Sequence, residues 1–254
     1  MRVSIHRLIT CSSTNDVAKD MARQGALEGT VVVSEEQTAG RGTKGRSWYS
    51  GRGQGLYVSL LLRPGRPEIS LLALAAGLAV QEAVQRSHHL IVQLRWPNDI
   101  VWEGKKLGGV LCESGFLGNR QDYVILGIGL NVNHEENDFP VDIRARAVSM
   151  RMAIKEKADG ESLLRQLLSS LERWSGIFFR ADGRLDIVQA FERCSAFEKG
   201  DPLTVMTNDK RVQGVFQGID PSGALLVEDE TGIHRYLSAE VSGVSQISKE
   251  PNIK

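Results

Sequence analysis

A glycine-rich basic loop is the first stretch of the sequence that could carry chemistry. It reads GRGTKGRS over Gly40–Ser47, and no Asp or Glu occurs from Gln37 through Pro67. Glycine lets backbone N–H groups approach an anion closely, and guanidinium groups supply charge and paired donors for phosphate or carboxylate. The loop therefore predicts an anion-binding site, with a solvated basic surface loop as the alternative. The cations up to residue 53 are Arg41, Lys44, Arg46 and Arg52.

The same loop nearly matches the phosphate-binding pattern G-x-x-x-x-G-K-[ST], with Arg46 in the place of the lysine. A loop of that kind leads into a helix whose N-terminus helps to bind phosphate. Here residues 48–55 read WYSGRGQG and lead into a strand pattern instead. The sequence therefore argues against a triphosphate P-loop. The rings of Trp48 and Tyr49 are available either to stack on a flat ligand or to pack in the core.

Two other segments place polar groups next to strand patterns. The segment Arg95–Asp99, RWPND, follows a strand pattern and is stiffened by Pro97. Lys106 precedes two glycines within an apolar run, so it is either a surface charge of a hairpin or a buried cation aimed at a carboxylate. Strand ends that open into loops are common places for binding sites.

The hydrophobic pattern predicts an α+β domain that positions these segments, because β-branched and apolar runs indicate strands and helical spacing indicates helices. Strands are expected at residues 2–10, 29–35, 56–62, 91–96, 100–102, 107–113 and 123–132. Helices are expected from the caps at residues 12–15 through Met21, and at 67–86, 160–179 and 185–194, with Pro67 in a first turn. From 200 to 247, short alternating runs between turn residues predict a small all-β barrel, with a domain boundary near residues 198–200.

The composition narrows the class of protein. Lys plus Arg and Asp plus Glu number 31 each, so the net charge is zero, which argues weakly against non-specific nucleic-acid binding as the main role. No apolar run reaches the ~20 residues that span a bilayer, and no signal peptide is recognised. Cys11, Cys112 and Cys194 form no C-x-x-C pair, so reduced thiols of a cytoplasmic protein are expected.

Taken together, the motifs resemble the biotin–protein ligase family, the biotin–[acetyl-CoA-carboxylase] ligases, from about Cys11 to Val244. The matching segments are Ser13-Thr14-Asn15, the Gly-Arg loop from Gln37 to Trp48, Trp96-Pro97-Asn98-Asp99, Lys106-Leu107-x-Gly109, Gly127-x-Gly129-x-Asn131-x-Asn133 and Gly218 to Leu225. The resemblance implies an α+β fold, with a mixed β-sheet backed by helices as in the class II synthetases and biotin–lipoate ligases. It also implies a catalytic domain over residues 1–198 and a C-terminal SH3-like β-barrel over residues 199–254.

The resemblance implies a two-step, ATP-dependent ligase that uses Mg²⁺. Biotin is activated to biotinyl-5′-AMP, and the biotinyl group passes to a lysine of the biotin carboxyl carrier protein domain of a biotin-dependent carboxylase. A monomer or homodimer without membrane attachment is expected. Because the chain begins almost at the catalytic domain, neither DNA binding nor transcriptional repression is expected. The alternatives are a lipoate–protein ligase and a non-catalytic module that binds nucleic acid or another anionic partner.

The family's site residues carry over to matching positions. Lys106 is expected to be the main catalytic group, and Arg41 is expected to close the loop over the adenylate. The expected biotin-binding residues are Ser13, Thr14, Asn15, Gln37, Gly40, Arg41, Gly42, Thr43, Lys106 and Gly109. The expected ATP-binding residues are Arg46, Trp48, Asn98 and Asn131, with Asp99 as a candidate Mg²⁺ ligand. Thr43 and Arg95 depart from the pattern, since many relatives carry Arg and Lys there.

Overall fold

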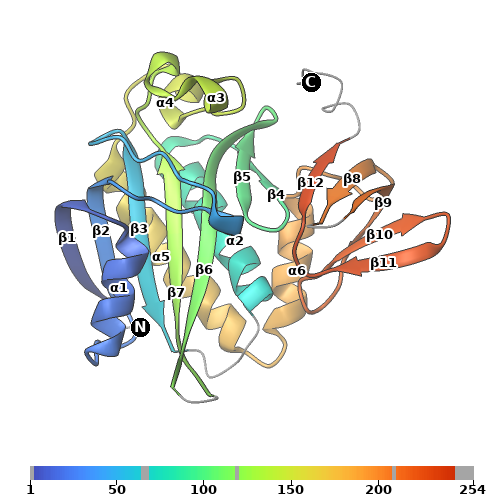
Figure 1. The fold of residues 1–254 in the computed structure, drawn as a ribbon, viewed down its shortest axis with the longest axis horizontal. Helices are drawn as coiled ribbons and strands as arrows, with labels where there is room; N and C mark the ends of the chain where they lie inside the picture. The colour runs from blue at the N-terminus through green and yellow to red at the C-terminus, as the bar shows by residue number, and fades with distance from the viewer. Residues whose placement is uncertain (1–2, 64–68, 118–119, 208–209, 244–254) are drawn as a thin grey trace.

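The computed structural model describes residues 3–63, 69–117, 120–207 and 210–243. A larger α+β domain lies beside a smaller all-β domain, to the right in Figure 1. The larger domain is built on a seven-stranded sheet in the order β1-β2-β3-β7-β6-β5-β4. Its strands are β1 Ser4–Cys11, β2 Thr30–Gln37, β3 Gly55–Leu62, β4 Gln93–Arg95, β5 Asp99–Trp102, β6 Lys105–Leu117 and β7 Arg120–Asn131.

Among the described strands of this sheet, only β1 and β2 pair in parallel, and the other neighbouring strands are antiparallel. A parallel pair needs a crossover connection, which helix α1, Thr14–Arg23, supplies. Strand β3 is buried along nearly its whole length because helices cover both faces of the sheet there. This explains why its sequence is a continuous apolar run rather than an alternating one.

Helix α1 covers one face of the sheet over β2, β3 and β7. The opposite face is covered by α2, Ile69–His88, and α5, Gly160–Phe179, with α6, Gly183–Arg193, packed against both. Helix α2 is apolar around most of its circumference because it lies between the sheet and the other two helices. The short helices are α3 Val141–Arg144 and α4 Met150–Ile154, and the 3₁₀ turns are η1 Thr43–Gly45 and η2 Glu136–Asp138.

The smaller domain is a five-stranded antiparallel sheet in the order β11-β10-β9-β8-β12. Two hydrogen bonds fix it to the larger domain: the Trp96 indole donates to the Gly223 carbonyl at 2.9 Å, and the Ile219 amide donates to the Glu192 carboxylate at 2.8 Å. The strands are β8 Pro202–Met206, β9 Arg211–Ile219, β10 Leu225–Asp229, β11 Gly232–Tyr236 and β12 Glu240–Gly243.

The predicted α+β class, with a helix-backed mixed sheet and a small C-terminal β domain, is confirmed. The sequence missed α3 and α4, which are too short to show a helical period. Strand β4 begins at Gln93, two residues later than expected, and it ends at Arg95, since Pro97 has no N–H for a sheet ladder. Residue 2, Pro67 and residues 244–247 lie outside the described residues. The division at 198/199 stays a prediction, and it falls between α6 and β8.

None of the helices in the described parts of the chain is both long and apolar enough to cross a membrane.

Candidate active site

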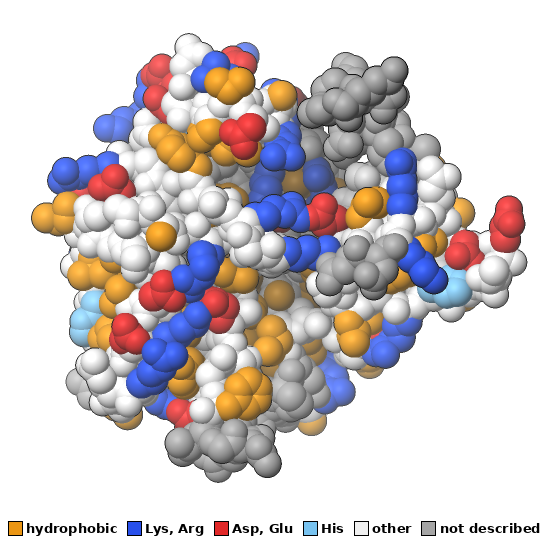
Figure 2. Space-filling view, viewed as in Figure 1, with side chains coloured by type: hydrophobic (Ala, Val, Ile, Leu, Met, Phe, Trp, Pro, Cys, Tyr) orange, Lys and Arg blue, Asp and Glu red, His pale blue; other side chains and the backbone are white. Residues whose placement is uncertain are grey.

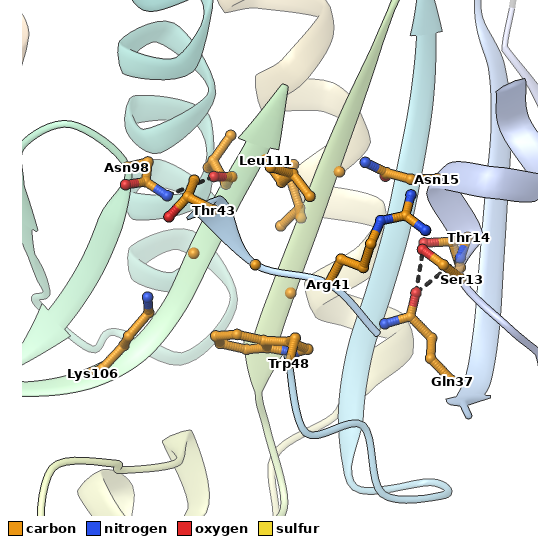
Figure 3. A pocket seen from close by; sticks show the side chains of 16 residues that line it. Ser13, Thr14, Asn15, Gln37, Arg41, Thr43, Trp48, Asn98, Lys106 and Leu111 are labelled. Carbon is orange, nitrogen blue, oxygen red and sulfur yellow. Dashed lines mark hydrogen bonds between the residues drawn. The ribbon is translucent and has the colours of Figure 1, made fainter. Parts of the chain in front are cut away.

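A pocket opens on the α1 face of the central sheet, where α1, β6, β7 and the loop of residues 40–48 meet (Figure 3). Its free volume is about 40 Å³, which is room for a few water molecules. A ligand of cofactor size therefore requires the lining of the pocket to rearrange. The lining residues are Ser13, Thr14, Asn15, Gln37, Arg41, Gly42, Thr43, Trp48, Asn98, Lys106, Gly109, Val110, Leu111, Gly127, Ile128 and Gly129.

Glycines on β7 form the floor of the pocket because larger residues would collide with its walls. A Cβ atom at Gly129 would lie 2.7 Å from the Trp48 ring, and one at Gly127 would overlap the Asn15 amide. Both neighbours can therefore rest directly on the strand. The same alternation that makes β7 apolar on one face leaves this face bare for ligand-facing groups.

One end of the pocket carries a connected row of neutral polar groups. The Gln37 side-chain carbonyl accepts from the Thr14 amide at 2.8 Å and from its hydroxyl at 3.1 Å. The Ser59 hydroxyl lies 2.8 Å from the Thr14 hydroxyl and donates to the side-chain carbonyl of Asn15 at 2.6 Å. Ser13, Thr14 and Asn15 are each only 3% exposed. Such fixed amide and hydroxyl dipoles suit a neutral polar ring better than a full charge.

The other end of the pocket carries the ammonium group of Lys106, with the Trp48 ring between the two ends (Figure 3). The Lys106 Nζ atom lies 2.6 Å from the Asp99 carboxylate and 5.5 Å from the centroid of the Trp48 ring. Its side chain is 36% exposed, so Lys106 is a half-buried cation beside a carboxylate rather than a free surface charge. Asn98 holds this corner by donating to the Val110 carbonyl at 2.8 Å.

The loop of residues 40–48 is a small hairpin over the pocket. The Gly42 amide donates to the Arg46 carbonyl at 2.7 Å, and the Trp48 amide donates to the Gly40 carbonyl at 2.9 Å. Its tip, η1, turns through Lys44 and Gly45, which have φ angles of 57° and 73°. No helix follows it, which agrees with the rejection of a P-loop.

The loop contains no acid, but other elements supply acids to its cations. Arg41 pairs with Asp16 and Glu113, and Arg46 pairs with Glu240 of β12. Just beyond the loop, Arg52 lies 3.7 Å from Glu35. Of these three arginines, only Arg41 lines the pocket.

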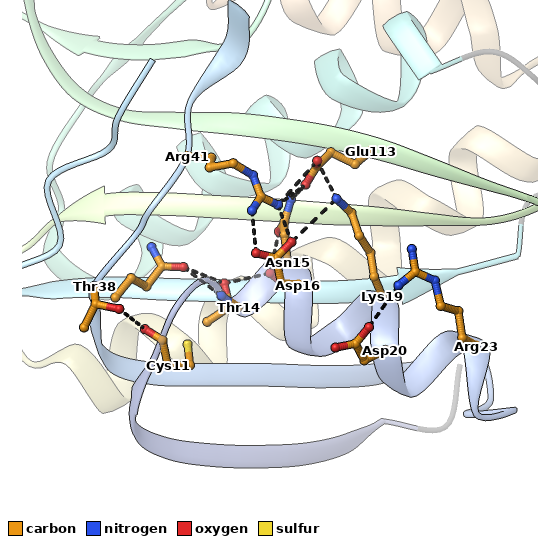
Figure 4. Close-up of polar contacts among 12 residues, drawn as sticks. Cys11, Thr14, Asn15, Asp16, Lys19, Asp20, Arg23, Thr38, Arg41 and Glu113 are labelled. Carbon is orange, nitrogen blue, oxygen red and sulfur yellow. Dashed lines mark hydrogen bonds and ion pairs between the residues drawn. The ribbon is translucent and has the colours of Figure 1, made fainter. Parts of the chain in front are cut away.

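The charges around Arg41 stabilise one another (Figure 4). The hydrogen bonds that Arg41 donates to Asp16 lower the pKa of the Asp16 carboxyl and raise the pKa of the guanidinium. Burial pushes the pKa of Glu113 upward, yet hydrogen bonds from Lys19, Asn15 and Arg41 bring it below the ordinary value. Arg41, Asp16 and Glu113 are therefore charged at neutral pH.

Most of the expected site residues lie together, and four of them lie elsewhere. Gly40 is buried where the loop crosses the Trp48 carbonyl, and a Cβ there would collide with that carbonyl. Arg46 points to the smaller domain through Glu240. Asn131 lies beneath Lys106 and donates to the Lys106 and Val148 carbonyls at 3.4 and 3.1 Å. The Asp99 carboxylate forms an ion pair with the ammonium of Lys106.

The residues brought together in the pocket are Ser13, Thr14, Asn15, Gln37, Arg41, Gly42, Thr43, Lys106 and Gly109, with Trp48 and Asn98 from the expected nucleotide side.

The sequence interpretation missed the charged group formed by Asp16, Lys19 and Glu113. Two signals pointed to it. Asp16 and Lys19 are spaced three residues apart on a helix, so they share a face. Glu113 alternates with Gly109 and Leu111 on β6, which turns all three toward the same face of the sheet.

A buried imidazole lies behind the loop. His134 has no exposed surface, stacks on Phe139 at 4.9 Å, and neither ring nitrogen has a hydrogen-bond partner among the described residues. Burial lowers its pKa to about 4, and Asp138 offsets this only in part. The Tyr49 ring also packs against His134, with ring centroids 5.8 Å apart, whereas Trp48 lines the pocket.

We expect His134 to make the protein less stable as pH falls from about 6.5 to about 4. The unfolded chain binds a proton in that range while the folded chain does not, so the loss approaches ~3 kcal/mol near pH 4. Urea unfolding at several pH values would measure it. His134→Phe should flatten that part of the pH dependence, whereas replacing the exposed His6 with Gln should not. An unchanged slope in His134→Phe would contradict this assignment.

The chain is similar in sequence to known proteins along most of its length. Residues 8–131 match the model of the biotin/lipoate A/B protein ligase family, and residues 200–243 match the biotin protein ligase C-terminal domain. The chain is 36% identical over 232 residues to the bifunctional ligase/repressor BirA of Bacillus subtilis, covering 91% of this chain and 71% of that protein. It is 31% identical to the biotin–[acetyl-CoA-carboxylase] ligase of Paracoccus denitrificans, covering 92% and 98% of the two chains.

Solved structures agree with the sequence relatives. The biotin protein ligase from Aquifex aeolicus, in complex with biotin and ATP, superposes with a TM-score of 0.82 at 28% identity. The match covers 94% of this chain and 99% of that one.

Proposed function

The chain belongs to the biotin protein ligase family, and on that premise we propose that it joins biotin to a carrier protein at the expense of ATP. Biotin would first become biotinyl-5′-AMP, and a lysine of a biotin carboxyl carrier protein domain would then take the biotinyl group. The observation that carries the proposal is the two-ended pocket. Buried neutral dipoles around Thr14 and Gln37 face one end, and the ammonium of Lys106 faces the other.

The first step brings two anions together. A carboxylate oxygen of biotin attacks the α-phosphorus of ATP, and the bond from that phosphorus to the pyrophosphate oxygen breaks. The ureido ring of biotin would be held by Ser13, Thr14, Asn15 and Gln37, which are donors and acceptors rather than charges. Lys106 would then lie at the reacting end, where a fixed cation offsets the repulsion between carboxylate and phosphate and the charge of the transition state.

The nucleotide would extend beyond Trp48. The indole N–H of Trp48 is buried without a partner among the described residues, and the Trp48 ring lines the pocket. An aromatic face suits a purine, and an unpaired buried donor suits a ligand oxygen or nitrogen. Asn98 is fixed beside this corner. Arg46 is engaged by Glu240 here, so its contact with the triphosphate would require that ion pair to open.

The second step transfers the acyl group. The amine of the carrier lysine attacks the acyl carbon of biotinyl-AMP, the bond to the phosphate oxygen breaks, and AMP leaves while the amine proton passes to solvent. Before the carrier arrives, the mixed anhydride must be kept from water. The hairpin of residues 40–48 lies over the pocket and would provide that cover.

We propose Mg²⁺ only as the ion bound to the phosphates of ATP. Asp99 is neutralised by Lys106, and the described residues contain no group of three or more His, Cys, Asp or Glu side chains that could hold a metal ion. The side chains present therefore do not fit a metal site made by the protein alone. Protein magnesium sites at nucleotides often use one or two carboxylates and the phosphates themselves.

The carrier-domain partner and the expected absence of repression stay predictions. The relative from Bacillus subtilis is named a ligase and a repressor, so a gel-shift assay with and without biotin and ATP is the direct test of DNA binding. Zero net charge favours no binding.

The proposed function is tested by pyrophosphate release from purified protein. We expect release that requires both biotin and ATP, and labelling of a carrier domain on its single acceptor lysine. Lipoate in place of biotin should give at most a small fraction of that rate. Release with lipoate but not biotin would favour the lipoate ligase. Absence of release with either acid, together with tight nucleic-acid binding, would favour the non-catalytic module.

A further inference from the structure

The guanidinium of Arg41 is held by carboxylates from two elements outside its own loop (Figure 4). Its two terminal nitrogens donate to Asp16 at 2.5 and 2.7 Å, and one of them also lies 3.1 Å from Glu113. Asp16 lies in the first turn of α1, and Glu113 lies on β6. Arg41, Asp16 and Glu113 are called the Arg41 clamp below. It joins the loop to both walls of the pocket.

The two carboxylates of the clamp do not line the pocket, whereas Arg41 does. They therefore act on any ligand through Arg41 and through Asn15, which donates to Glu113 at 2.7 Å. Their side chains are 38% and 24% exposed, and that of Arg41 is 34% exposed. Each ion pair this exposed contributes only modest stabilisation, although a bidentate geometry strengthens it. Such a contact can hold a loop and still open.

Lys19 competes with Arg41 for the same carboxylates. Its ammonium lies 2.6 Å from Glu113 and 3.8 Å from Asp16. Two cations and two carboxylates make a neutral cluster, visible in Figure 2 as interleaved blue and red side chains over α1 and β6. Removing a carboxylate should weaken the hold on Arg41. Removing Lys19 should strengthen it, because the carboxylates then have one cation fewer to share.

About 40 Å³ is free beneath the loop, so a ligand of cofactor size requires the lining, of which the loop is part, to rearrange. The loop's arms are bonded to each other, and its base is bonded to the end of β1 and the residue after it through the Thr38 and Ala39 amides. The hairpin is therefore able to move as a unit about that base once two attachments open, the clamp on the pocket side and the ion pair of Arg46 with Glu240 of the smaller domain.

We propose that Asp16 and Glu113 are positioning residues that hold Arg41, and with it the loop of residues 40–48, over the pocket. The clamp thereby limits how fast the acyl adenylate escapes before transfer. This inference rests on the proposed function for the identity of the trapped molecule. The closure of the loop itself does not depend on that identity.

The test uses Asp16→Asn, Glu113→Gln and the double variant, which keep side-chain shape and the acceptor for Asn15. Asp20→Asn is the matched control, because Asp20 lies on the same helix and pairs with Arg23 at 3.0 Å instead of with the loop. Biotinyl-5′-AMP is formed on each protein and its dissociation is followed by chase. We expect release about 10-fold faster or more in the double variant, unchanged release in the control, and slower release in Lys19→Met. Rising salt should speed release from wild type more than from the double variant.

A second measurement needs no ligand. Hydrogen exchange of the Gly42 and Trp48 amides, which bond within the loop, should be faster in the double variant than in wild type or the control. If wild type forms no adenylate, the proposed function fails while this exchange still tests the clamp. Exchange and release matching Asp20→Asn would overturn the inference. So would a Lys19→Met variant that loosens the loop as the carboxylate variants do, since that result indicates a merely structural contact.

Discussion

Lys106→Ala is expected to slow the formation of biotinyl-AMP by at least about 100-fold, equivalent to ~3 kcal/mol of transition-state stabilisation. Lys106 is the cation at the reacting end of the pocket. It lies at the start of β6, where the Asn131 side chain donates a hydrogen bond to its backbone carbonyl. Single-turnover measurement of pyrophosphate release with saturating biotin and ATP would give the rate of this step alone.

The matched control is Lys105→Ala. Lys105 is the neighbouring residue on β6, is exposed and does not line the pocket. It should leave the rate within about twofold, since a solvated charge outside the site is heavily screened. Thermal unfolding should shift little in Lys106→Ala, because the pair with Asp99 is partly exposed. Ordinary turnover in Lys106→Ala would remove this residue from the mechanism.

The sequence located the pocket residues well where chemistry was concentrated in short motifs. Gln37, Arg41 and Trp48 stand within twelve residues of one another, and their convergence with Lys106 follows from the antiparallel pairing of β2 with β3, β3 with β7 and β7 with β6. The long helices were predicted from the helical spacing of their apolar residues. The strands were predicted from continuous apolar runs, which arise because both faces of the sheet are buried.

What the sequence could not provide was the pairing of charges across the fold. A stretch free of acids predicted an anion-binding site, yet Asp16 and Glu113 reach Arg41 from 25 and 72 residues away. Glu240 reaches Arg46 from the other domain. Such contacts depend on tertiary placement rather than on local pattern. They change the meaning of the basic loop, because its cations are already partly neutralised before any anion binds.

Gly127→Ala should lower the affinity for biotin about 100-fold or more while leaving the protein folded. A Cβ atom at position 127 would overlap the side-chain amide of Asn15. Asn15 has little freedom to withdraw, because it is 3% exposed and is held by Ser59 at 2.6 Å and Glu113 at 2.7 Å. The methyl group would therefore displace the polar row at the neutral end of the pocket.

A matched glycine variant distinguishes a loss of biotin binding from a loss of stability. Gly176→Ala on α5 is the control, because a Cβ there meets nothing within 4 Å and alanine favours a helix by up to ~1 kcal/mol. That variant should bind biotin normally and unfold at the same or a higher temperature. Isothermal titration with biotin alone measures the neutral end without the adenylation chemistry. If Gly127→Ala bound biotin as wild type does, the row around Asn15 would not be the biotin end, and the orientation of the ligand between Thr14 and Lys106 would have to be reversed.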